Sequence, residues 1–191
     1  MLGSMRRAGI IGLLLALGTG SAHLAVRVWQ APRAVMAKLE TAVAEAAGGY
    51  NRCLHRRSPE LRRRGIRRPN PDVLPTTVAF DLSQGALRLK GPVWSDYWSL
   101  SIYQHNSDNI FVINDEALDG GTFNIVVSLA PLELGAGTTN VVSPTARGLV
   151  VVRRLVPGPR ALPALHRNQD GMTCSTMARL RRAAQTGRPL Q

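Results

Sequence analysis

Hydrophobic positions in the middle of the chain follow a period of two, which is typical of β-strands. Runs rich in β-branched or aromatic residues alternate with Gly-, Pro-, Asn- or Asp-containing turns from residue 73 onward. Six of them have strand length: Val73–Phe80, Ala86–Lys90, Tyr97–Gln104, Ile110–Ile113, Phe123–Leu129 and Leu149–Val156. No helical pattern lies between them. We therefore expect a mainly β fold, an antiparallel, jelly-roll-like sandwich over residues 71–175.

Helical spacing is found on both sides of this region. Residues 30–49 form a unit in which an amphipathic helix ends at Gly48-Gly49. Its apolar positions recur every three or four residues: Val35, Met36, Leu39, Val43 and Ala46. We expect this face to pack on the domain or to continue an anchor. A second, short helix is predicted over residues 174–185, with Met177, Leu180 and Ala184 on one face, at the start of a basic C-terminal tail, residues 176–191.

The N-terminal region, residues 1–29, has the pattern of a membrane-targeting segment. Residues 8–26 follow Arg6 and Arg7 and carry no formal charge. These nineteen residues would span about 28 Å as a helix, close to the hydrocarbon thickness of a bilayer. A transmembrane anchor is one interpretation. A cleaved signal peptide is the other, because the most apolar part is short and residues 20–22 (Gly-Ser-Ala) are small. We expect a single-pass protein of the inner (cytoplasmic) membrane with its domain on the periplasmic side.

The net charge of +12 is unevenly distributed along the chain. Residues 52–68 carry +7 and residues 147–191 carry +8, whereas residues 69–146 carry −6. An acidic middle between basic flanks differs from a uniformly basic nucleic-acid binder. The Arg-rich connector, residues 50–70, also lacks the interleaved aromatic residues that stack on bases. Contact with anionic lipid or with an acidic partner stays open for these flanks.

The densest polar cluster is QHNSDN, residues 104–109. His105 and Asp108 could form a base with its orienting carboxylate, or bind a ligand. The weak ligand-binding candidates are His105, Asn106, Asp108, Asn109 and Asp115. A structural interpretation competes, because Asn, Asp and Ser side chains stabilise turns between strands. The sequence has no GxSxG elbow, phosphate-binding loop, HExxH or CxxC, so we assign no catalytic, cofactor-binding or metal-binding residue.

The chain has two cysteines, Cys53 and Cys174. They are too few for a structural zinc site. If the domain is exported, they could form a disulfide that closes a loop of about 120 residues, adding roughly 4 kcal/mol on chain-entropy grounds. Free buried thiols are the alternative.

Three strings resemble the domain-of-unknown-function 1254 family, in particular its short, N-terminally anchored bacterial members: RPNPDVLPTTVAFDLSQGALRL, YWSLSIYQHNSDNIFVINDEAL and SPTARGLVVVRRLVPG. The resemblance covers about residues 48–175. Pro75-Thr76 departs from it, since relatives commonly have Tyr-Ser there, and so does Ala86, where Pro is usual. The resemblance implies a partner protein with a second β domain, of the 1214 type, and no established chemistry.

These observations predict a bacterial cell-envelope protein that is a non-catalytic binding or interaction module. An enzyme, or an enzyme subunit, with a polar site near His105 and Asp108 is the first alternative. Binding of an anionic lipid surface through the Arg flanks is the second.

Overall fold

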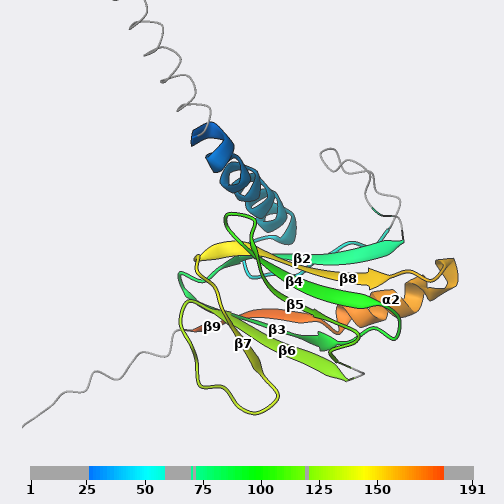
Figure 1. Cartoon of the computed structure of the whole chain (residues 1–191). Helices are drawn as coiled ribbons and strands as arrows, with labels where there is room; N and C mark the ends of the chain where they lie inside the picture. The colour runs from blue at the N-terminus through cyan, green and yellow to red at the C-terminus, as the bar shows by residue number, and fades with distance from the viewer. Residues whose placement is uncertain (1–25, 59–69, 71, 119–120, 179–191) are drawn as a thin grey trace, which may run out of the picture.

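The computed structural model describes residues 26–58, 70, 72–118 and 121–178 and has two β-sheets (Figure 1). The elements are β1 Leu54–His55, β2 Val73–Asp81, β3 Gly85–Pro92, β4 Trp98–Gln104, β5 Asn109–Asn114, β6 Thr122–Ser128, β7 Thr139–Val142, β8 Arg147–Leu155, η1 Pro159–Ala161, α2 Leu162–Asp170 and β9 Thr173–Ala178. One sheet is antiparallel, in the order β1-β2-β8-β4-β5. The other has the order β7-β6-β3-β9 and is mixed, because β7 runs parallel to β6.

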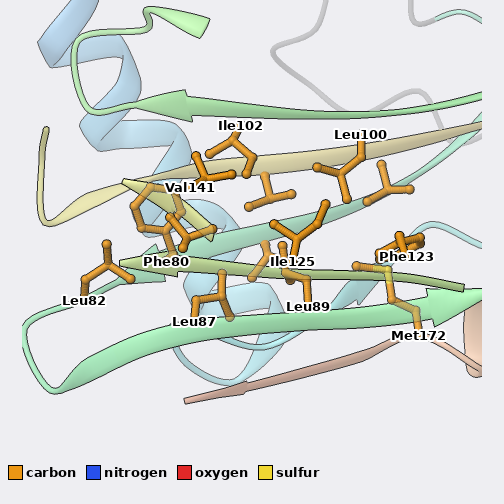
Figure 2. Packing of buried hydrophobic residues seen from close by; sticks show 14 of the residues in the cluster. Phe80, Leu82, Leu87, Leu89, Leu100, Ile102, Phe123, Ile125, Val141 and Met172 are labelled. Atoms are coloured by element: carbon orange, nitrogen blue, oxygen red, sulfur yellow. The ribbon is translucent and has the colours of Figure 1, made fainter. Parts of the chain in front are cut away.

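The hydrophobic core lies between the two sheets (Figure 2). It is formed by alternate residues of facing strands, and its largest members include Phe80, Trp98, Leu100, Ile102, Phe123 and Ile125. Trp98 and Phe123 stack across the sheets with ring centroids 5.8 Å apart. The period of two in the sequence thus places one apolar face of each sheet inward. All six predicted strands are confirmed, with ends that shift by at most a few residues.

Gly148 in β8 allows the strands of the first sheet to approach closely. A Cβ atom at this position would overlap the backbone oxygen of Tyr103 and would lie 2.5 Å from the ring of Phe80. Glycine is therefore required here by space.

A helix over residues 26–47 packs on the outer face of the first sheet (Figure 1). Its contact is a small apolar cluster in which Met36 and Ala44 pack against Ala79 and Leu149 of the sheet. The predicted helix is confirmed, and its packing face is confirmed in part. Met36 is buried and Val43 packs against the same cluster, whereas Val35 and Leu39 are 56% and 42% exposed. The buried stripe of the helix consists of Met36, Glu40 and Ala44, which are four residues apart.

The C-terminal region differs from the prediction in one respect. A short helix is present, but it is α2, Leu162–Asp170, and residues 173–178 form strand β9 instead of the start of a helix. The reason is that β3 needs a partner on its second side, and β9 pairs with it from Gly85↔Ala178 to Lys90↔Thr173. The sequence analysis also missed β1 and β7, which have two and four residues. Strand β1 lies inside the segment expected to be a connector.

The segment predicted to enter the membrane, residues 8–26, lies almost entirely outside the described residues. Within the described part of the chain, none of the helices has the length and apolar character needed to cross a bilayer.

Candidate functional site at the helix–sheet junction

Residues 104–109 form the turn between β4 and β5, and most of their polar groups bind one another. The Asp108 carboxylate accepts hydrogen bonds from Gln104 Nε2 at 3.0 Å and from Asn106 Nδ2 at 2.6 Å. The Asn106 side-chain oxygen in turn accepts from the Asp108 backbone N–H at 3.1 Å. Ser107 has a positive φ of 76°, which the tight turn requires. The side chains of Asn106 and Asp108 therefore stabilise the turn that carries them.

The imidazole of His105 binds the N-terminal helix. Its Nδ1 lies 3.0 Å from both carboxylate oxygens of Glu40. The Glu40 side chain is only 2% exposed, and the His105 side chain is 34% exposed. The His105 backbone N–H donates to Thr145 Oγ1 at 3.0 Å, which fixes the turn to the loop before β8. The structure thus joins three distant segments of the chain at one carboxylate–imidazole pair.

Burial raises the pKa of the Glu40 carboxyl, although the hydrogen bond and charge of His105 oppose this. Two other charges act on this carboxyl: Arg147 lowers its pKa and Asp81 raises it. These two residues form their own ion pair, with Arg147 Nε 2.9 Å from Asp81 Oδ2. Arg147 also lies 5.2 Å above the centroid of the Tyr50 ring. The junction is therefore an ordered electrostatic network around one buried acid.

The remaining predicted residues are only partly brought together. Asn109 begins β5 next to the turn. Asp115 follows the other end of β5, where its backbone N–H donates to Trp98 O at 3.3 Å. The six residues of β5 separate Asp115 from His105 by about 20 Å along the strand. His105, Asn106, Asp108 and Asn109 share one end of the sheet, and Asp115 is at the opposite end.

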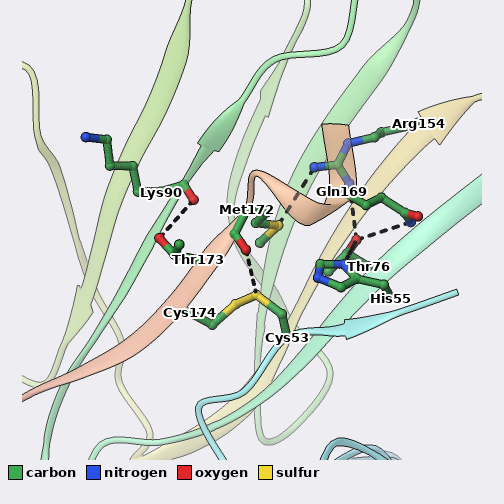
Figure 3. The surroundings of a disulfide bond; sticks show 9 residues. All are labelled: Cys53, His55, Thr76, Lys90, Arg154, Gln169, Met172, Thr173 and Cys174. Carbon is green, nitrogen blue, oxygen red and sulfur yellow. Dashed lines mark hydrogen bonds between the residues drawn. A yellow bond between two sulfur atoms is a disulfide. The ribbon is translucent and has the colours of Figure 1, made fainter. Parts of the chain in front are cut away.

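A second polar cluster lies inside the domain, beneath α2 (Figure 3). Arg154 of β8 is 1% exposed, and its guanidinium donates to Asn168 Oδ1 at 2.7 Å and to Thr76 Oγ1 at 3.2 Å. Burial lowers the pKa of Arg154 to about 10, so it remains a cation at neutral pH. His55 Nδ1 lies 2.9 Å from the same Thr76 hydroxyl. Burial, together with the charges of Arg57 and Arg154, lowers the pKa of His55 to about 4.

Cys53 and Cys174 form a disulfide beside this cluster, with Cα atoms 5.6 Å apart (Figure 3). It joins the segment before β1 to β9 across 121 positions. Cys53 Sγ lies 3.9 Å from the backbone oxygen of Met172, a contact without a proton because the sulfur is oxidised. The bond therefore fastens the two ends of the described domain to each other.

The sequence offered no signal for Glu40, the most buried acid of the junction. A glutamate between helical apolar positions is assigned to the solvent face by hydropathy, and only the packing of Met36 and Ala44 on the sheet shows otherwise. Among the described residues, no three His, Cys, Asp or Glu side chains are grouped as a metal site would require.

The model of the family described as "Protein of unknown function (DUF1254)" matches residues 50–176. The chain belongs to the DUF1254 family. The match begins at Tyr50, before β1, and ends inside β9, so it contains β1 to β8 and the first four residues of β9. No curated protein matches the chain.

Two solved structures illustrate how this DUF1254 chain compares with larger proteins. The VPA0106 protein from Vibrio parahaemolyticus aligns with a TM-score of 0.51 and 14% identity, over 56% of this chain and 28% of that one. An uncharacterised protein from Burkholderia cenocepacia aligns with a TM-score of 0.43 and 19% identity, over 72% and 38% of the two chains. The first similarity shows a shared fold. This chain covers well under half the length of either protein.

Proposed function

We propose that this DUF1254 protein is a membrane-attached envelope protein whose sandwich is an interaction module for a partner with a second β domain, of the 1214 type. The disulfide supports an exported location, since such bonds persist in oxidising compartments. The Glu40–His105 pair supports a fixed attachment of the sandwich to the N-terminal helix, because it joins the helix to the sheet.

The observation that carries this proposal is the outer edge of β5. This strand ends the first sheet, and its sequence, Asn109–Asn114, has no charged residue and no proline. Val112 on it is 57% exposed. Soluble β-proteins usually protect an edge with charge, proline or shortness, because an open edge pairs with other strands. An uncharged edge of six residues is suited to receive a strand of a second β domain.

The other sheet edges are less suitable. Strand β1 has two residues and β7 has four. Strand β9 has six, but the segment before β1 is fastened to it by the Cys53–Cys174 disulfide and by the bond from Asn51 Nδ2 to Thr176 Oγ1 at 3.0 Å. The edge of β5 is therefore the one that we assign to the partner.

Site-specific photo-crosslinking tests this assignment. The full chain is co-expressed with a 1214-type β-domain protein of the same genome, and a photoreactive amino acid replaces Val112. A crosslink to that protein is expected, and an excess of unlabelled wild-type chain should compete it away. An equal excess of unlabelled Val112→Lys should leave it, because a lysine on an edge opposes strand pairing. Val142, which is 44% exposed on β7, provides the matched control position. A crosslink of equal yield from Val142, or none from Val112, would reject the β5 edge.

The Glu40–His105 pair favours a second candidate, an enzyme. A buried carboxylate that orients an imidazole is the arrangement of a general base. Within the described residues, His105 Nε2 has no hydrogen-bond partner, and the side chain is 34% exposed. Hydrolysis of p-nitrophenyl acetate by the full chain tests this idea. If the wild type and His105→Gln both hydrolyse this ester no faster than free imidazole does, the enzyme candidate is excluded.

A further inference from the structure

The first turns of the N-terminal helix expose apolar residues to solvent. Val26, Val28 and Trp29 are 53%, 65% and 73% exposed. Every residue from 26 to 35 is exposed, and the first buried one is Met36. Half of the large hydrophobic residues exposed in the described chain lie on this one helix. Apolar side chains gathered in this way mark an interaction surface.

The charges beside this surface have one sign. Arg33 lies one turn after Trp29, and its guanidinium carbon is 4.8 Å above the centroid of the indole ring. Arg27 is in the same two turns. The sequence has no acidic residue from position 8 to position 39, and the first one, Glu40, is buried against the sheet. The surface is therefore apolar and cationic, which complements a layer of anionic phosphates above hydrocarbon.

The sequence before the helix indicates which partner has this chemistry. Residues 8–26 carry no formal charge, and they end where the exposed turns begin. Trp and Arg directly after an apolar segment are typical of the boundary between hydrocarbon and headgroups, where the indole ring has an apolar body and a polar N–H.

We propose that residues 26–33 cross the boundary between the hydrocarbon and the headgroup layer of a phospholipid bilayer, with Trp29 at this boundary and Arg27 and Arg33 on lipid phosphates. This proposal rests on the membrane attachment proposed above. It also sets the position of the domain. Met36 follows Trp29 by about 10 Å along the helix axis. Packing of the helix on the sheet therefore begins at the outer limit of the headgroup layer.

The turn between β4 and β5 then faces the membrane surface. The Ser107 hydroxyl lies 3.4 Å from Pro32 O, a backbone atom of the helix about 4.5 Å beyond Trp29 along the axis. The turn is polar, and its side chains are bound to one another, so it can lie next to headgroups without exposing apolar groups. This arrangement holds the sandwich close to the bilayer.

Depth-dependent fluorescence quenching tests the proposal on the full chain in vesicles of phosphatidylcholine and phosphatidylglycerol. The Trp29→Phe variant identifies the contribution of Trp29 against the other tryptophans, and its exposed position makes the variant harmless to the fold. The Trp29 emission is the difference between the wild type and this variant. We expect lipids brominated near the glycerol end of the acyl chain to quench it. Lipids brominated near the chain terminus are expected to quench it less.

Flotation of the vesicles separates the possible failures. If the protein floats with the vesicles and the Trp29 emission is unquenched by either lipid, the headgroup position is wrong while membrane attachment stands. Stronger quenching from the chain terminus would also overturn it, since Trp29 would then lie in the hydrocarbon. Failure to float would overturn both proposals. In the wild type, quenching is expected to be stronger in vesicles that contain phosphatidylglycerol than in vesicles of phosphatidylcholine alone. Arg33→Gln is expected to remove this difference, and Lys38→Gln, a turn further on, is expected to keep it.

Discussion

Replacing Glu40 by glutamine is expected to leave the helix–sheet junction intact, whereas replacing His105 by alanine is expected to weaken it. In Glu40→Gln the amide oxygen still accepts from His105 Nδ1, and the cost of burying a carboxylate disappears. We expect a change in the free energy of unfolding within about 1 kcal/mol, with stabilisation near neutral pH. His105→Ala leaves the buried Glu40 carboxylate without this donor, which costs about 1–3 kcal/mol.

The pH dependence gives the sharper comparison. Burial raises the pKa of Glu40 above its usual value of 4.5. The folded state therefore binds this proton more tightly than the unfolded state. Stability from this group is fully present below pH 4.5 and is lost as the pH rises through the raised pKa. The wild type should gain stability relative to Glu40→Gln as the pH falls from neutral toward 4.5.

Urea unfolding combined with hydrogen exchange of the amides of residues 36–44 measures both effects. Exchange is needed because the helix can detach locally before the sandwich unfolds. If Glu40→Gln weakens the protection of this segment as much as His105→Ala does at neutral pH, the ionised pair is a net source of stability. The reasoning from burial would then be refuted.

Three further predictions concern the sandwich itself. Replacing Cys53 and Cys174 together by serine should lower the free energy of unfolding by about 4–5 kcal/mol, measured with urea, because the bond closes a loop across 121 positions; dithiothreitol should reproduce the loss in the wild type and leave the variant unchanged. Gly148→Ala should cost more than about 3 kcal/mol, since its Cβ would overlap the backbone oxygen of Tyr103; a melting temperature equal to the wild type would disprove the close approach. His55, with a pKa of about 4, binds its proton less tightly when folded. Its contribution is therefore lost as the pH falls from 6.5 to 4, and His55→Gln should flatten the dependence of stability on pH in that range.

The strands could be predicted from the sequence because their signal is local. Each inward face repeats every second residue, as in Trp98, Leu100 and Ile102, and a β-sandwich needs little more than this pattern. Strand β9 could not be predicted in this way. Residues 173–178 adopt a strand because β3 has an open side and Cys174 is bonded to Cys53, and both facts depend on chain segments far away.

The candidate site shows the same limit more clearly. The turn of residues 104–109 was identified from its Asn, Ser and Asp content, and its internal hydrogen bonds follow from those residue types. The partner of His105 did not follow, because the nearest acid in sequence, Asp108, is bound within the turn while Glu40 comes from a helix 65 positions earlier. The Glu40 side chain is only 2% exposed. Its burial exists only because the helix packs on the sheet through Met36 and Ala44, so the acid and the packing depend on each other. A charged group at such a contact is a cost that a leucine would avoid, and its presence there is the physical reason to test whether this junction does more than hold the helix.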